Sequence, residues 1–328
     1  MTSKLSDKHL VIIDASCFYY SIGKQLREWE DRKVRILTKQ ASTGNIINPS
    51  YDDLVKCLLR GINDVKCYLP SVSVDTEAVP LWVLDKKDSR YGGYWRHEHL
   101  LDEYGIVYKT GRTKKSETVA KLPEFFRQQG YPYIQTEGLE ADDLAGLVCR
   151  LCSSDDRLPK RITLLTLDTD WLGLITNPSE FSSYPESSSS YKHYLNSGMT
   201  VDWYSISPFK PRYRHNADMI NRWLKRRKYS QTVKAPSELW DIKAEYGDKS
   251  DSLPPNSPIG VIDLLEPSLD PLADPDSRDY YLSLLLQLSE YDLGNHEHYG
   301  LLGASKAMLN ILGFPHLPLP YYPSKQQC

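Results

Sequence analysis

The sequence has few cysteines, no long apolar run and almost no net charge. Six cysteines are scattered over 328 residues, so they predict no disulfide framework and indicate a reducing compartment. No apolar run approaches the ~18 residues that span a membrane, and the opening residues Met1–Lys4 do not match a secretory signal. A formal charge of -3 excludes a uniformly basic protein. We therefore expect a soluble intracellular protein.

The small net charge conceals two segments of opposite sign. Residues 210–234 contain nine Lys or Arg and one acidic residue, whereas residues 261–328 contain nine acidic residues and three basic ones. A basic segment favours an anionic partner such as nucleic acid. The acidic segment would repel DNA, so we expect it to pack within the protein or to dock another protein.

Three apolar runs have the length of β-strands, and each is followed by an aspartate. The runs cover residues 10–13, 81–84 and 162–167, and the aspartates are Asp14, Asp85 and Asp168. Because the runs are apolar throughout, both faces of each strand are expected to be buried, as in a parallel sheet covered by helices. Helical patterns at residues 51–65, 119–129 and 141–152 lie between them. The sequence thus predicts an α/β fold with a mainly parallel twisted sheet flanked by helices.

The strand pattern stops after residues 171–174, and the periodicities that follow are helical. A Ser-rich stretch at residues 179–190 predicts an exposed loop, and helices are expected at residues 217–228, 278–291 and 304–312. We divide the chain near residue 205. Residues 1–205 are predicted to form the α/β core, and residues 206–328 to form a mostly helical part that contacts nucleic acid.

Carboxylates gather where the predicted strands end. Ligands of open α/β sheets bind at the carboxyl ends of the strands, so the three aspartates are expected along one edge. Further acidic residues stand close together at Glu140, Asp142 and Asp143, at Asp168 and Asp170, and at Asp248 and Asp251. Any one of them is explained as a helix cap or a solvated loop residue. Carboxylates this dense, however, repel one another unless a cation is present.

The ligand types indicate a hard cation, because almost no histidine or cysteine accompanies these carboxylates. The nine candidate metal ligands are Asp14, Asp85, Glu140, Asp142, Asp143, Asp168, Asp170, Asp248 and Asp251. All-oxygen ligation favours Mg²⁺, with Mn²⁺ as a substitute. Two such ions about 4 Å apart would activate a water and stabilise the leaving oxygen of a phosphodiester.

Five short motifs carry a resemblance to a known family. In chain order they are Val11-Ile12-Ile13-Asp14, Val83-Leu84-Asp85 with Gly93-Tyr94-Trp95-Arg96, Gly138-Leu139-Glu140-Ala141-Asp142-Asp143, Thr166-Leu167-Asp168-Thr169-Asp170-Trp171 and Gly247-Asp248-Lys249-Ser250-Asp251. With them the chain resembles the structure-specific 5′ nucleases, the flap endonucleases and 5′→3′ exonucleases, and most closely their phage ribonuclease H type branch. The resemblance covers about residues 8–263. It implies a PIN-like nuclease core with a helical arch at about residues 97–129.

The same resemblance implies a role for each acidic residue. One metal ion would lie nearer to Asp85, Glu140, Asp142 and Asp143. The other ion would lie nearer to Asp168, Asp170, Asp248 and Asp251, and Asp14 would organise the site. Asp248 and Asp251 would thus be contributed by the second part of the chain.

Basic residues between the second and third motifs belong to the expected arch. Composition alone favours an exposed, solubilising loop at residues 108–115. The resemblance instead implies that Lys109, Arg112 and Arg96 meet the scissile phosphate and stabilise charge that develops on oxygen. Tyr108 would stack on a base near the junction, and Lys114 and Lys115 would contact the strand.

The second basic segment is expected to contact phosphates without reading bases. Its residues are Lys210, Arg212, Arg214, Arg222, Lys225, Arg226, Arg227 and Lys228. The alternative is a charged surface helix with Trp223 and Leu224 in the core. Both interpretations hold if one face of the helix packs and another meets phosphates.

The chain departs from the family pattern after Asp251. Where the family has a glycine-bearing hairpin that clamps the duplex, often with a bound K⁺, this chain has Pro254, Pro255 and Pro258. Proline lacks the backbone N–H that such a turn offers to phosphate. This argues against a K⁺ site and predicts a rebuilt contact with the duplex.

By this resemblance the protein is expected to be a Mg²⁺-dependent 5′→3′ exonuclease and flap endonuclease that also removes RNA primers. It would use a two-metal mechanism and leave a 5′ phosphate and a 3′ hydroxyl. Expected partners are DNA and RNA/DNA duplexes with 5′ ends or flaps, and single-strand-binding or clamp proteins of the replication machinery. We expect a monomer in the bacterial cytoplasm, as a phage-encoded protein.

Three other functions compete with this expectation. A Toprim-like phosphotransfer domain would use Asp168 and Asp170, but it would leave residues 140–143 unexplained. A catalytically weak or inactive protein of the same fold would bind branched DNA without cutting it. A single-strand ribonuclease on a related α/β fold would need fewer carboxylates, and it would leave residues 247–251 and the pair Lys109 and Arg112 unexplained. The complete set of nine carboxylates favours an active nuclease, because such repulsion has no purpose without a cation.

Overall fold

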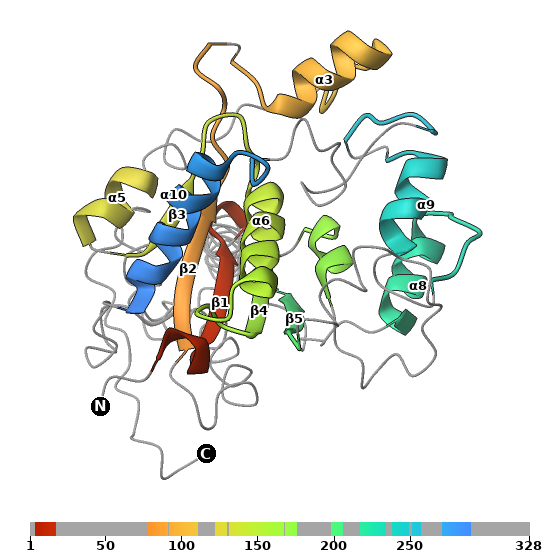
Figure 1. Cartoon of the computed structure of the whole chain (residues 1–328). Helices are drawn as coiled ribbons and strands as arrows, with labels where there is room; N and C mark the ends of the chain where they lie inside the picture. Colours follow the sequence, from red (N-terminus) through yellow and green to blue (C-terminus); the bar gives the residue numbers. More distant parts are fainter. Residues whose placement is uncertain are drawn as a thin grey trace, which may run out of the picture.

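The computed structural model describes residues 4–17, 78–90, 92–110, 122–129, 131–166, 168–175, 198–205, 217–233, 238–248, 251–256 and 271–289. These ranges contain a sheet of five parallel strands in the order β3-β2-β1-β4-β5 (Figure 1). The strands are β1 (His9–Asp14), β2 (Ala78–Leu84), β3 (Tyr133–Gln135), β4 (Arg161–Thr166) and β5 (Thr200–Ser205). The predicted α/β fold with a parallel sheet is confirmed.

The three strands predicted from apolar runs form the middle of the sheet. β1 pairs with β2, with Asp14 opposite Val83, and with β4, with Ile13 opposite Leu165. Every residue of β1 is buried, which agrees with a strand covered on both faces. Because the strands run in the same direction, the residues that follow them meet at one edge of the sheet.

The two outer strands were not predicted, and the prediction that the sheet pattern ends at residues 171–174 is wrong. β5 pairs with β4 from Thr200 to Ser205, and β3 pairs with β2 over only three residues. β3 and β5 are the two edge strands of the sheet. An edge strand has a neighbouring strand on one side only and needs no continuous apolar run. Residues 171–174 instead belong to a 3-10 helix, η2 (Asp170–Leu174), which contacts α6 and α9.

The helices are α3 (Trp95–Tyr104), α5 (Leu122–Gln129), α6 (Ala141–Ser154), α8 (Ala217–Arg226), α9 (Glu238–Tyr246) and α10 (Pro275–Leu286), with short 3-10 helices η1 (Leu5–Asp7) and η6 (Gln287–Ser289). The helices predicted at residues 119–129, 141–152 and 217–228 correspond to α5, α6 and α8. The predictions at residues 51–65, 179–190 and 304–312 lie outside the described residues.

The helix predicted at residues 278–291 begins earlier, as α10. Asp274 caps it by accepting the Ser277 N–H at 3.0 Å, and Pro275 occupies the first turn. An N-cap aspartate followed by proline is a strong start signal, because proline needs no hydrogen-bond partner there. The apolar periodicity alone therefore placed the start three residues too late.

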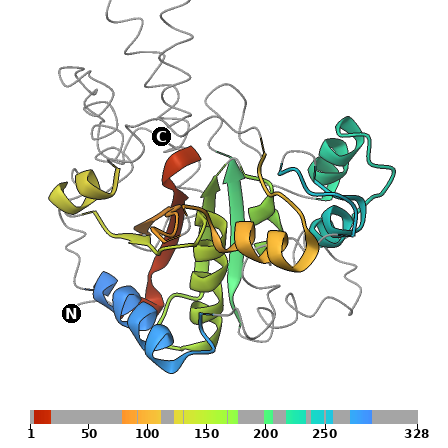
Figure 2. The ribbon, with the colours of Figure 1, turned by 90° about the horizontal axis from the view of Figure 1, so that it is seen from above.

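Helices α6 and α10 lie over the same face of the sheet (Figures 1 and 2). α6 contacts β1, β2 and β3, and its apolar side chains are part of the main core. The Tyr281 hydroxyl of α10 donates to Thr136 Oγ1 at 3.0 Å, next to the end of β3. Burial of α6 against the sheet holds its first turn beside the carboxyl ends of β1 and β2.

Helices α8 and α9 lie beside each other, on the β5 side of the sheet (Figures 1 and 2). α9 packs on η2: Trp240 Nε1 donates to the carbonyl of Asp170 at 2.8 Å. The division of the chain near residue 205 stays a prediction. Within the part of the chain that the structure describes, every helix is too short or too polar to cross a membrane.

Candidate metal centre

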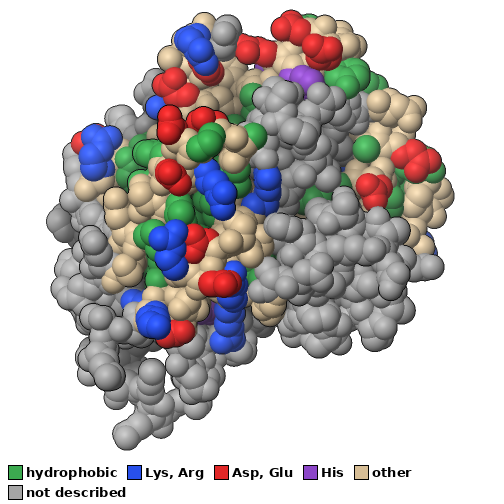
Figure 3. Space-filling view, viewed as in Figure 1, with side chains coloured by type: hydrophobic (Ala, Val, Ile, Leu, Met, Phe, Trp, Pro, Cys, Tyr) green, Lys and Arg blue, Asp and Glu red, His purple; other side chains and the backbone are tan. Residues whose placement is uncertain are grey.

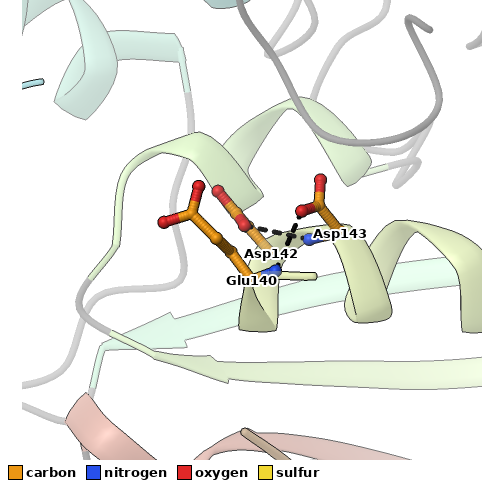
Figure 4. A group of neighbouring side chains, drawn as sticks. All are labelled: Glu140, Asp142 and Asp143. Atoms are coloured by element: carbon orange, nitrogen blue, oxygen red, sulfur yellow. Dashed lines mark hydrogen bonds between the residues drawn. The ribbon is translucent and has the colours of Figure 1, made fainter. Parts of the chain in front are cut away.

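Three acidic side chains meet at the first turn of α6 (Figure 4). Glu140 is the N-cap, and Asp142 and Asp143 lie in the first turn. The Asp143 carboxylate accepts the Glu140 N–H at 3.0 Å, and Asp142 Oδ1 accepts the Asp143 N–H at 2.9 Å. One oxygen from each carboxylate lies within 4.8 Å of the others, and all three residues are buried. We call these residues the first acidic cluster.

Two cations, Arg96 of α3 and Lys109 of the predicted arch, contact the first acidic cluster. Arg96 Nη1 lies 2.9 Å from Glu140 Oε2, and Arg96 Nη2 lies 2.5 Å from Asp143 Oδ1. Lys109 Nζ also hydrogen-bonds Glu140. The Arg96 side chain is 4% exposed and that of Lys109 is 13% exposed. Arg96 is thus enclosed, whereas Lys109 keeps some contact with solvent.

The pKa values of the three carboxyls diverge, because the cations are shared unequally. Burial raises the pKa of Asp142 well above its ordinary value, and repulsion by Asp143 adds to this against the attraction of Arg96. Burial raises the pKa of Asp143 as well, despite its bonds with Arg96. Burial also acts on Glu140, but Lys109 and Arg96 outweigh it and lower the pKa of Glu140 to about 2. An additional cation would therefore stabilise the ionised forms of Asp142 and Asp143.

A turn from the later part of the chain brings two more carboxylates to this place. Asp248 and Leu253 exchange two backbone hydrogen bonds, of 3.0 and 2.9 Å, which close the turn. The carbonyl of Asp251 accepts the Lys109 N–H at 2.8 Å, and Asp251 Oδ2 lies 3.1 Å from the Tyr108 hydroxyl. The same hydroxyl lies 3.0 Å from a carboxylate of the first acidic cluster. The turn thus joins the base of the predicted arch to that cluster.

The three aspartates that follow strands lie at one edge of the sheet. Asp14 Oδ2, at the end of β1, accepts the Thr166 hydroxyl from the end of β4 at 2.9 Å. Thr166 Oγ1 in turn accepts the Asp168 N–H at 3.0 Å, so one buried threonine links the two aspartates. Asp85 Oδ1, after β2, accepts the Ala141 N–H at 2.7 Å, which connects it to the first turn of α6. The role of these aspartates as metal ligands stays a prediction.

Asp168, Asp170 and Asp248 form a second acidic cluster next to Lys243 of α9. Lys243 Nζ hydrogen-bonds Asp170 and lies 2.7 Å from Asp248 Oδ2. Burial and the neighbouring Asp170 raise the pKa of Asp168 to about 7. Burial lowers the pKa of Lys243, but Asp170 and Asp248 outweigh burial and raise it above its ordinary value. Asp170 and Asp248 thus contact this lysine directly, and the charge of Asp168 adds to the rise in its pKa.

Lys243 and Thr166 are site residues that the sequence analysis does not identify. One signal for Lys243 exists, since it follows the buried Trp240 by three residues and therefore lies on the same face of the helix. A lysine on a buried helix face needs an acidic partner. Thr166 opens the fourth motif, but a threonine at a strand end is ordinary in any sheet, so its hydrogen bond to Asp14 was not predicted.

Two residues that were expected to touch nucleic acid are turned inward. Tyr108 is 4% exposed, and its ring meets His97 edge to face at 5.2 Å between centroids. Arg96 is occupied by carboxylates, as described above. In this arrangement both side chains are buried, and the stacking of Tyr108 on a base and the contact of Arg96 with phosphate stay predictions. Arg112, Lys114 and Lys115 lie outside the described residues.

The outer surface of α3, within the predicted arch, is acidic and apolar. Figure 3 shows acidic side chains gathered over α3. Asp102 and Glu103 are exposed there, and so are Leu101 and Tyr104, with 52% and 51% of their surfaces accessible. Of the basic residues described in this segment, Lys109 faces inward, whereas Arg127 of α5 is exposed and pairs with Glu124 at 2.8 Å.

The basic residues of α8 and the turn after it face solvent, while the same helix packs into the core. The exposed residues are Arg222, Lys225, Arg226, Arg227 and Lys228. Leu224 is fully buried. The arrangement is compatible with both interpretations of this segment, and its contact with phosphate stays a prediction. Lys210, Arg212 and Arg214 lie outside the described residues.

The ligand atoms of the first acidic cluster fit a hard divalent cation. All three side chains offer carboxylate oxygens, and oxygen is the ligand atom that Mg²⁺ and Mn²⁺ prefer. The raised pKa values of Asp142 and Asp143 agree with this, because a bound cation favours the ionised carboxylate. Geometry and electrostatics therefore allow this cluster to hold a metal ion.

Comparison with known proteins gives neighbours in structure but not in sequence. No protein-family model and no curated protein matches the chain. The chain is similar to a flap endonuclease of bacteriophage T5 in a pseudo-enzyme–product complex with DNA and metal ions, with 16% identity, 94% of this chain and 95% of that chain covered, and a TM-score of 0.40. It is also similar to a 5′-exonuclease of bacteriophage T5 with bound zinc, with 16% identity, 94% and 100% covered, and a TM-score of 0.40.

These neighbours belong to the class of 5′ nucleases that the five motifs of the chain resemble. A TM-score of 0.40 describes a loose superposition.

Proposed function

We propose that the protein is a divalent-metal-dependent 5′ nuclease that hydrolyses phosphodiesters where single-stranded and double-stranded nucleic acid meet. The observation that supports this function best is the buried first acidic cluster with Lys109 at its side. Three carboxylates in one helical turn suit a cation, and a partly exposed lysine next to them suits the phosphate that a cation would meet. A site for storing a cation would need no such lysine.

Each group of residues has a distinct part in the proposed reaction. Asp85 and the first acidic cluster would hold one divalent ion, and Asp168, Asp170, Asp248 and Asp251 would hold the other. When bound, the ions would supply an activated water and would neutralise charge on the leaving oxygen. Arg96 keeps Glu140 and Asp143 oriented through its two nitrogens.

Lys109 is the residue proposed to act on the substrate. Its ammonium contacts Glu140 and lies over the Tyr108 ring, 4.9 Å from the ring centroid. When a phosphate approaches, the ammonium can exchange Glu140 for a phosphate oxygen, while the hydrogen bond from its backbone N–H to Asp251 keeps the residue in place. The lysine would then stabilise the negative charge that grows on the phosphate during hydrolysis.

The finer features of the function are part of the same proposal. The physiological ion would be Mg²⁺, with Mn²⁺ as a substitute. The substrates would be 5′ flaps, nicked duplex ends and RNA primers on DNA, and the products a 5′ phosphate and a 3′ hydroxyl. We also propose a monomer of phage origin that works in the bacterial cytoplasm with single-strand-binding or clamp proteins.

Cleavage of a 5′-labelled flap, beside an unstructured single strand of the same sequence, tests this function. With Mg²⁺ we expect cutting near the flap junction and little cutting of the single strand, and with EDTA we expect none. Asp142→Asn should abolish cleavage without unfolding the protein, because it removes one metal ligand. The matched control is Asp102→Asn on the exposed end of α3, which should cleave normally.

Two results would contradict the proposal. Full cleavage by Asp142→Asn would exclude the first acidic cluster as the metal site. Salt-sensitive binding of the flap without cutting, in Mg²⁺ and in Mn²⁺, would indicate the alternative function, a protein that binds branched DNA.

A further inference from the structure

Lys243 is a buried cation among candidate metal ligands. Its Nζ hydrogen-bonds Asp170, lies 2.7 Å from Asp248 Oδ2 and lies 3.4 Å from Thr169 Oγ1. The side chain is 3% exposed. Asp170 and Asp248 both belong to the group proposed to hold the second divalent ion. A lysine and a metal ion are therefore attracted to the same oxygens.

Packing holds Lys243 in this position. It lies on the buried face of α9, with Trp240 one turn before it. Trp240 donates to the carbonyl of Asp170 at 2.8 Å, and its ring covers Gly173 so closely that a Cβ there would lie 2.1 Å from Cε2. α9 is thus fixed against η2 at Asp170, which is also the residue that Lys243 contacts. The close packing of α9 on η2 therefore holds the ammonium of Lys243 at the second acidic cluster.

The ammonium and a divalent ion exclude each other at these oxygens. An ammonium donates three hydrogen bonds to oxygens at about 2.8 Å, whereas Mg²⁺ takes the same lone pairs at about 2.1 Å. Two positive centres that contact the same carboxylates would be only a few ångströms apart, and their repulsion is strong away from bulk water. One of them must leave Asp170 and Asp248 before the other can bind.

We propose that Lys243 is a resident cation that offsets part of the negative charge of the second acidic cluster in the metal-free protein and competes with a divalent ion for Asp170 and Asp248. This inference rests on the proposed function, because it concerns ligands of the proposed second ion. The lysine is a positioning residue: it keeps the carboxylates together until an ion replaces it. Binding of the second ion then requires the ammonium to withdraw from the two aspartates.

Lys243→Met tests the competition, because methionine keeps an unbranched side chain and removes the charge. Binding of Mn²⁺ to the full chain without nucleic acid would be followed by calorimetry and by electron paramagnetic resonance of the free ion. We expect Lys243→Met to bind Mn²⁺ at one site roughly tenfold or more tightly than the unchanged protein. Lys4→Met, at an exposed lysine before β1, is the matched control and should leave Mn²⁺ binding unchanged. Adding Asp248→Asn to Lys243→Met should abolish the gain.

Stability provides a second readout that a purely structural lysine would not show. Without Lys243 the carboxylates lose their cation, so Lys243→Met is expected to unfold at a lower temperature in the absence of metal. Mn²⁺ should then restore its stability by more than it stabilises the unchanged protein. If the variant is unfolded without metal, it should fold when Mn²⁺ is added.

Two outcomes would overturn the inference. One is an Mn²⁺ affinity that Lys243→Met does not increase, which includes the case in which neither protein binds the ion. The other is a loss of stability that saturating Mn²⁺ does not recover. Neither measurement uses cleavage, so a failure of the unchanged protein to cut flaps would count against the nuclease function and not against this competition.

Discussion

Replacing Gly247 with alanine is expected to disturb both acidic clusters from one position. Gly247 has a φ of +79°, and a Cβ there would lie 2.5 Å from the carbonyl oxygen of Leu253, 2.8 Å from the carbonyl carbon of Pro254 and 2.9 Å from the nitrogen of Pro255. All three are backbone atoms, so no rotation of a side chain relieves the contact. The turn that carries Asp248 and Asp251 has to open.

The expected loss of stability has two parts. A left-handed conformation costs an alanine about 1–2 kcal/mol relative to glycine. Opening the turn also breaks the two backbone hydrogen bonds between Asp248 and Leu253, each worth about 0.5–1.5 kcal/mol. Gly247→Ala should therefore lower the free energy of unfolding by about 2–5 kcal/mol.

The matched control is Gly105→Ala at the C-terminal end of α3. Gly105 has a φ of +64°, but a Cβ there would have no atom within 4 Å. This variant should lose only the conformational part, about 1–2 kcal/mol. Urea denaturation measures the loss in free energy of unfolding for each variant. The larger loss in Gly247→Ala reports the close backbone contact at that position.

Cleavage of the flap substrate by Gly247→Ala and by Gly105→Ala tests the effect on function. Gly247→Ala should cut far more slowly even where it is folded, because Asp248, Asp251 and the hydrogen bond from Lys109 to Asp251 move with the turn. Gly105→Ala should cut normally once folded. Equal losses of stability in the two variants, or normal cutting by Gly247→Ala, would refute the reasoning.

Two further predictions concern buried charge. Arg96→Met removes the guanidinium that pairs with Glu140 and Asp143, so the free energy of unfolding measured in urea near pH ~8 should fall by about 3–5 kcal/mol. This loss of stability should become smaller toward pH ~5, because Glu140 and Asp143 without the guanidinium take up protons more readily in the folded state. A loss of stability that does not change with pH would argue against the pairing. Burial, with a smaller effect of Arg161, lowers the pKa of His9 from 6.5 to about 4. The unfolded chain therefore binds more protons than the folded one between these values, and the protein should lose about 3 kcal/mol as the pH falls through this range. His9→Gln should show a shallower loss in thermal unfolding, and an unchanged pH profile would exclude His9 as its source.

The middle of the sheet and the start of α6 were predictable because local chemistry is enough to define them. A strand buried on both faces has to be apolar throughout, which is why the runs before Asp14, Asp85 and Asp168 are recognisable. A helix start has unpaired N–H groups that favour carboxylates, which explains Glu140 and its neighbours. The outer strands β3 and β5 were not predicted, because a strand at the end of a sheet lacks the continuous apolar run of a strand that is buried on both faces.

The sequence by itself therefore determined a parallel α/β sheet and a set of carboxylates at the ends of its strands. Only the tertiary structure decided which charges meet. Lys243 and Asp170 are 73 residues apart in the chain, and Arg96 and Glu140 are 44 residues apart. Ion pairs of this kind form because folding places distant segments within a few ångströms, where burial removes the screening of water. Periodicity and motif spacing describe neighbours along the chain and do not record that proximity.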